Sequence, residues 1–105
     1  MAWILLILAG LLEVAWAFTM KLSDGFTKVS YSVITIVILV TSLIMLSISM
    51  RTIPLGTAYS IWTGIGAVGA FVVGILFLGE SATSMRILAA VLIISGLLLM
   101  KISAS

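Results

Sequence analysis

Four long apolar runs, separated by short polar segments, set the pattern of this chain. Each run has about twenty residues, the length that an α-helix needs to cross the hydrocarbon core of a bilayer. Inside lipid, every backbone N–H and C=O group must be hydrogen-bonded within the segment, which favours helix even for the second run with its many β-branched residues. The pattern therefore predicts four transmembrane helices, at residues 2–20, 31–50, 57–78 and 85–102.

Three short loops join these predicted helices. The first, at 21–28, carries Asp24-Gly25 and favours a tight turn, and the second, at 51–56, contains the only proline. Loops of this length leave no room for an extramembrane domain. We therefore expect one all-α membrane domain over residues 1–105, a multi-pass protein whose consecutive helices are antiparallel neighbours.

The composition excludes several classes of protein. Hydrophobic residues make up 64% of the chain and charged residues 8%, with a mean hydropathy of +1.48, so a soluble domain is excluded. Cysteine and histidine are both absent, which removes disulfides, imidazole bases and the usual zinc ligands, so we expect no enzyme activity, no metal and no cofactor. The five cations are scattered along the sequence, a pattern that suggests neither a nucleic-acid partner nor a polybasic lipid site.

Glu13 is the candidate for chemistry, because it is the one ionisable residue well inside a predicted span. At ~1.5 Å per residue it lies roughly 16 Å below the start of its helix, about half of the hydrocarbon core. Placing an ionisable side chain inside lipid has a high free-energy cost, and such residues usually mark a path for an ion or a substrate. The alternative is a protonated carboxyl group that only ties helices together.

The helix face that carries Glu13 also carries small residues and one tryptophan. Ala9, Gly10 and Ala17 lie on this face and leave room either for another helix or for a ligand beside the carboxylate. Trp16 lies one turn from Glu13, so its indole could donate a hydrogen bond to the carboxylate or offer an aromatic face to a cation. The predicted site can therefore hold a proton or a cation.

Hydroxyl groups recur every seven residues along the second predicted helix, at Thr35, Ser42 and Ser49. This stripe indicates helix packing, although Ser42 lies near the depth of Glu13 and could also orient the carboxylate. On the third helix, Tyr59 and Trp62 share one face and are candidates for either the site or the interfacial aromatic belt.

Glycines follow these aromatic residues closely on the third helix. Gly64 and Gly66 could form a conformational hinge, or they could allow close helix packing. On the fourth helix, Ala89 and Gly96 are seven residues apart on a surface of Leu, Ile and Val, which suggests a seam for dimer packing.

The distribution of cations gives almost no preference for one orientation. The end of the bundle with the second loop and the C-terminus carries two Lys or Arg residues and the other end carries three: Arg51 and Lys101 against Lys21, Lys28 and Arg86. Since an excess of Lys and Arg fixes orientation, the chain could insert both ways and form an antiparallel homodimer. The alternative is that smaller effects impose one orientation.

Two segments carry a resemblance to a known family. Glu13 lies in Leu-Glu-Val-Ala-Trp-Ala-Phe, and residues 53–66 read Ile-Pro-Leu-Gly-Thr-Ala-Tyr-Ser-Ile-Trp-Thr-Gly-Ile-Gly. Together they resemble the small multidrug resistance transporters, over essentially the whole chain. Trp16 and Ser42 look like those of the guanidinium exporter subtype of that family.

The resemblance implies an antiparallel, dual-topology homodimer of eight helices in the bacterial inner (plasma) membrane, with both copies of Glu13 in one central site. It implies export of guanidinium and small substituted guanidinium cations in exchange for protons. The binding residues would be Glu13, Trp16, Ser42, Tyr59 and Trp62, with Gly64 and Gly66 as the hinge. Two alternatives stay open: a broad exporter of quaternary ammonium and other hydrophobic cations, and a structural or pore-forming subunit that transports nothing.

Overall fold

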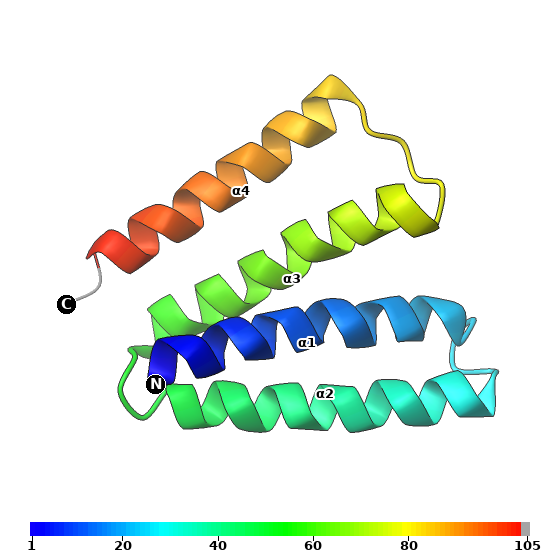
Figure 1. The fold of residues 1–105 in the computed structure, drawn as a ribbon, viewed down its shortest axis with the longest axis horizontal. Helices are drawn as coiled ribbons and strands as arrows, with labels where there is room; N and C mark the ends of the chain where they lie inside the picture. Colours follow the sequence, from blue (N-terminus) through cyan, green and yellow to red (C-terminus); the bar gives the residue numbers. More distant parts are fainter. Residues whose placement is uncertain (104–105) are drawn as a thin grey trace.

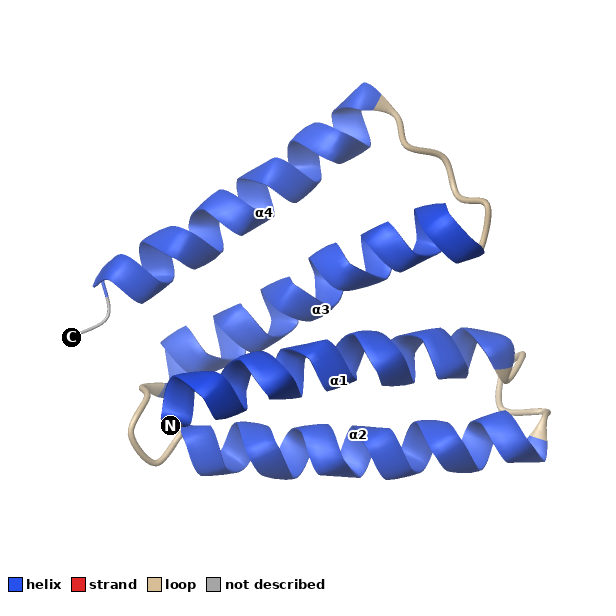
Figure 2. Cartoon of the chain, in the orientation of Figure 1, coloured by secondary structure: helices blue, strands red, loops and turns tan. Residues whose placement is uncertain are grey.

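The computed structural model describes residues 1–103 and contains four α-helices joined by short loops (Figures 1 and 2). They are α1 (Ala2–Leu22), α2 (Val29–Ser49), α3 (Leu55–Phe77) and α4 (Ser84–Ser103). All four are long and apolar enough to cross a membrane, so the prediction of an all-α protein with four such helices is confirmed. The end of each helix lies within two residues of its predicted position. For example, α3 begins earlier than predicted because Pro54, whose fixed φ suits a helix start, is its N-cap.

The helices form a thin layer with overall dimensions of 43 × 35 × 17 Å. In this layer α1 packs extensively against both α2 and α3, and α4 lies on the far side of α3 (Figure 1). The expectation that all consecutive helices are neighbours is therefore wrong for α2 and α3, which contact each other only sparsely. The loop at residues 50–54 lies against the first turn of α1, with Arg51 and Thr52 beside Trp3, so the chain passes this end of α1 on its way from α2 to α3.

The buried apolar side chains gather around α1 near the end of the bundle that carries this loop. They are Leu6, Ala9, Leu46, Ile53, Ala58, Ile61 and Trp62. No residue of α4 is buried within the described chain. Most of the apolar surface of α4 is therefore free to contact lipid or a second protein chain.

The loop between α1 and α2 contains the predicted tight turn. Asp24, Gly25 and Phe26 all have positive φ, at 50°, 70° and 65°. Ser23 stabilises the turn, because its hydroxyl donates to the carbonyl of Met20 (2.6 Å) and accepts from the N–H of Phe26 (3.0 Å). The loop is thus a compact reversal that sets α2 antiparallel to α1.

Candidate functional site

Glu13 is half-buried on the side of α1 that faces α3. Its carboxyl group lies against Gly66, so that a Cβ atom at Gly66 would overlap the Oε1 atom and the carboxyl carbon. Ala or any larger residue at this position would displace the acid. The absence of a side chain at Gly66 is what allows α1 and α3 to approach each other at the depth of Glu13.

Two other glycines of α3 also lie in tight contacts with side chains. A Cβ at Gly64 would overlap Leu97 of α4, and one at Gly69 would overlap Val14 of α1. These contacts directly support the packing interpretation of the glycines. Because α3 is one continuous helix from Leu55 to Phe77, a hinge at Gly64 and Gly66 stays a prediction.

Two buried polar atoms, on side chains three residues apart in α1, lack hydrogen-bond partners. Neither Glu13 Oε1 nor Trp16 Nε1 has a partner among residues 1–103. The expected hydrogen bond from the Trp16 indole to the carboxylate is therefore not made within one subunit. A buried donor or acceptor without a partner costs about 1–3 kcal/mol, so each such group in a native protein calls for an explanation. Here both groups belong to the candidate site.

A chain of hydrogen bonds ties α3, α2 and α1 together. The Trp62 indole N–H donates to the hydroxyl of Ser42 (3.0 Å), and this hydroxyl donates to the backbone carbonyl of Ala9 (2.7 Å). All three residues are buried. Ala9 lies one helical turn before Glu13. Ser42 thus approaches the acid through the backbone of α1 rather than by a bond to the carboxylate.

The rest of the hydroxyl stripe on α2 is also buried. The hydroxyl groups of Thr35 and Thr19 share a hydrogen bond of 2.7 Å between α2 and α1, and Ser49 bonds to the carbonyl of Leu46 in its own helix (2.7 Å). The seven-residue spacing indicated this stripe, whereas the partners Thr19 and Ala9 were missed. A lone threonine and a backbone carbonyl give no periodic signal in a sequence.

Tyr59 faces a different part of the molecule from Glu13. Its ring centroid lies 5.7 Å from that of Trp62, and the side chain is 53% exposed. It lines a cavity of about 470 Å³ between α3 and α4, together with Gly64 and Gly96. Within one subunit, the structure thus brings Tyr59 to Trp62 but not to the carboxylate.

The two small residues proposed for dimer packing lie on the side of α4 that faces α3, where each lines an open cavity between the two helices. Ala89 and Gly96 are both exposed, and a Cβ at Gly96 would meet no atom within 4 Å. The seam predicted at these residues is therefore open in the single chain.

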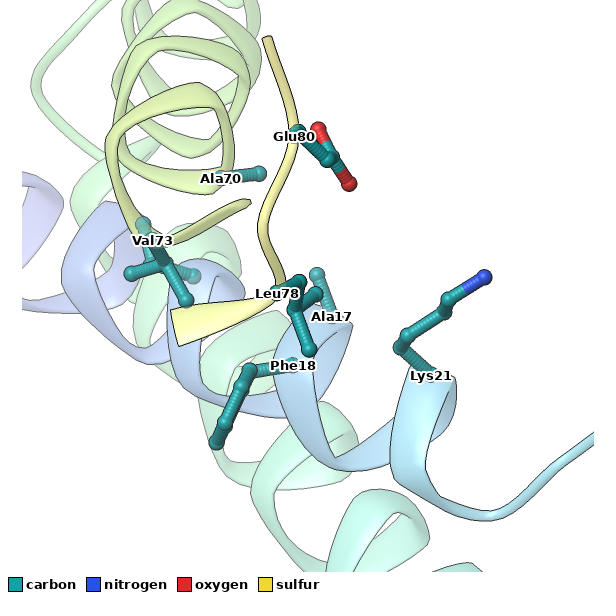
Figure 3. Close-up of a pocket in the computed structure, with 8 residues that line it drawn as sticks. Ala17, Phe18, Lys21, Ala70, Val73, Leu78 and Glu80 are labelled. Carbon is teal, nitrogen blue, oxygen red and sulfur yellow. The ribbon is translucent and has the colours of Figure 1, made fainter. Parts of the chain in front are cut away.

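A second polar cluster, missed in the sequence, lies at the opposite end of α1 and α3. Lys21 and Glu80 stand at one side of a cavity of about 160 Å³, whose apolar wall includes Phe18, Val73 and Leu78 (Figure 3). Glu80 forms an ion pair with Arg86 (3.6 Å). Both partners are more than 40% exposed, so this pair contributes little to stability. Lys21, Glu80 and Arg86 are isolated charges in the sequence, which gave no sign that they lie close together in the fold.

The described residues 1–103 contain no group of three or more acidic side chains that could hold a metal ion. The polar groups available to a ligand near the middle of the bundle are the Glu13 carboxyl group and the Trp16 indole N–H. A carboxylate beside an indole suits a small organic cation that carries hydrogen-bond donors.

Comparison with known proteins gives a consistent picture. The family model for Small Multidrug Resistance protein matches residues 1–93. The chain is 54% identical over 103 residues to a protein of Citrobacter freundii named "Guanidinium exporter", with 98% of each chain covered. Proteins with the same name from Salmonella typhimurium strain LT2 (54% over 104 residues, 99% of each chain) and Escherichia coli O6:H1 (50% over 103 residues, 98% of each) are similarly close.

Proposed function

Because the chain belongs to the Small Multidrug Resistance protein family, we propose that it exports guanidinium and small substituted guanidinium cations in exchange for protons. It would act as an antiparallel homodimer of eight helices in the bacterial inner membrane. The names of the similar proteins support a guanidinium transporter, and a transport role is consistent with the expectation that the chain is not an enzyme.

The observation that carries this proposal is the buried Oε1 atom of Glu13, which has no partner among residues 1–103. A carboxylate deep in a membrane-spanning helix needs either a proton or a cationic partner. A guanidinium ion supplies a planar fork of N–H donors that matches the geometry of a carboxylate, and it can satisfy both oxygens at once. A proton on the carboxyl group blocks that arrangement, so the two ligands exclude each other.

This mutual exclusion explains how the exchange would be coupled. When a proton binds Glu13, the guanidinium ion loses its anionic partner and leaves; when the proton leaves, the next cation can bind. Trp16 would place its free indole N–H and its ring beside the bound cation. Ser42 and Trp62, joined by their hydrogen bond, would hold α1 at the correct depth and set the shape of the site.

An inverted second copy would complete the site. Glu13 lies at the middle of α1, while Ser42 and Trp62 lie in the half of the bundle nearer the second loop. Two antiparallel subunits would bring two such sets to the midplane from opposite sides. The exposed surface of α4, with Ala89 and Gly96, offers a face on which the copies could pack. The balance of two cations against three permits insertion in both orientations.

The test is exchange by purified protein in liposomes under an imposed pH gradient, with guanidinium as the substrate. We expect guanidinium to move against protons in the parent and Glu13→Gln to abolish this coupled movement while the dimer still assembles. Tetrapropylammonium, which has no N–H group, serves as the comparison substrate and separates a guanidinium exporter from a broad exporter of hydrophobic cations. Coupled exchange that survives in Glu13→Gln would end the single-site mechanism.

A further inference from the structure

We infer that the end of the bundle around Arg51 and Trp3 binds the phosphate-bearing headgroup of an anionic phospholipid. A cavity of about 620 Å³ opens there between the first turn of α1 and the loop after α2. Arg51 and Thr52 line it together with apolar side chains of both helices, among them Trp3, Leu5 and Ile48.

The two cations of this end lie near the same tryptophan although they are far apart in sequence. Lys101, near the end of α4, places its Nζ atom 5.2 Å from the centroid of the Trp3 ring, and Trp3 lines the same cavity as Arg51. The sequence, in which the five cations are scattered, gives no sign of this shared neighbour. Trp3 is thus a neighbour of both Lys101 and Arg51.

This end also lacks compensating negative side chains. The acidic residues of the chain are Glu13 in mid-helix and Asp24 and Glu80 in the two loops of the opposite end. Among residues 1–103, the only ion pair joins Arg86 and Glu80. Arg51 therefore has no carboxylate partner in the described chain, and its guanidinium group is available to an external anion.

The depth and mixed character of the cavity point to a lipid rather than to a free ion. With 21 residues, α1 is about as long as the hydrocarbon core is thick, so its first turn lies at the boundary between this core and the lipid headgroups. Trp3 is of the type that occupies this boundary. Apolar walls beside an arginine and a threonine hydroxyl match the glycerol and phosphate parts of one amphiphilic molecule, and basic pockets between transmembrane helices bind such headgroups.

The experiment measures retention of phosphatidylglycerol against phosphatidylcholine by purified protein, using native mass spectrometry. Replacing Arg51 alone would also change the balance of cations between the two ends, and hence the orientation in the membrane. The test variant is therefore Arg51→Gln/Lys28→Gln, which keeps the parent's difference of one cation, and the control Lys28→Gln shows what the loss of the distant cation does by itself. We expect the double variant to bind phosphatidylglycerol about tenfold more weakly than the control, the loss typical of one charged hydrogen bond.

Three outcomes would overturn the proposal. Binding of phosphatidylglycerol by the double variant at the level of the parent would show that Arg51 makes no specific contact. A loss in Lys28→Gln as large as that in the double variant would mean that only net charge matters. Displacement of the lipid by excess inorganic phosphate would mean that the site recognises a free phosphate ion. Arg51→Lys/Lys28→Gln, which retains a cation at 51, should recover part of the binding and shows that the fold tolerates the change.

Discussion

The carboxyl group of Glu13 occupies the space beside Gly66 that a Cβ atom would otherwise fill. This contact connects a residue expected to bind protons and cations with a glycine expected to act as a hinge. It gives Gly66 a role that needs no bending of α3, because any side chain there would push the carboxyl group out of its position. The position of the Glu13 carboxyl group thus depends on a glycine at residue 66 of α3.

The first prediction compares Gly66→Ala with Gly69→Ala. The new methyl group at 66 meets the end of a flexible side chain, so we expect Gly66→Ala to fold normally but to displace Glu13 and lower guanidinium exchange severalfold. At 69 the methyl group meets Val14, a stiff β-branched residue, and overpacking of this kind typically costs about 1–3 kcal/mol. Gly69→Ala should therefore lower thermal stability in detergent more than it lowers exchange per folded dimer. Equal loss of exchange in both variants would contradict a specific role for Gly66.

The second prediction concerns the hydrogen bonds of Ser42. Ser42→Ala removes the acceptor of the Trp62 indole N–H and leaves this donor buried without a partner, at a cost of about 1–3 kcal/mol. Ser49→Ala is the matched control, because Ser49 is equally buried but bonds only to Leu46 in its own helix. We expect a clearly larger drop in unfolding temperature for Ser42→Ala than for Ser49→Ala. Similar drops would show that the link to Trp62 adds nothing to stability.

The helices were predictable from hydropathy, but their neighbours were not. In a membrane, a residue that faces lipid and one that packs against a helix are both apolar, so the sequence does not reveal that α2 and α3 each pack mainly against α1 and only sparsely against each other. The target of Ser42 was hidden for a different reason. Its acceptor is the backbone carbonyl of Ala9, and every residue offers such a carbonyl. Pairing of the Trp16 indole with Glu13, by contrast, was a reasonable expectation that the single subunit does not fulfil.

The third prediction tests whether Trp16 selects the substrate by its bulk. Trp16→Gly opens space beside the acid and removes the indole donor, so the ratio of guanidinium to tetrapropylammonium transport should fall as the larger cation gains access. Trp16→Phe keeps most of the bulk and should keep the larger cation excluded. Both ratios are measured in liposomes and normalised to folded dimer. An unchanged ratio in Trp16→Gly would assign this residue to packing alone.

The fourth prediction tests whether function needs both orientations. Ser81→Lys/Ala82→Lys adds two cations to the end that already has more, so the difference between the ends rises from one to three and should force a single orientation. Export in cells should then fall strongly, because no inverted partner forms. In Lys21→Gln/Lys28→Gln/Thr52→Lys the cation excess lies at the opposite end, so this variant should insert in the opposite orientation. Co-expression of the two variants should restore export, whereas this second variant alone should also export weakly. Resistance to added guanidinium gives the measurement, and protein levels in the membrane give the control. If the first variant alone exports as well as the parent, an antiparallel pair is not required and the dimer of the proposed mechanism must be replaced.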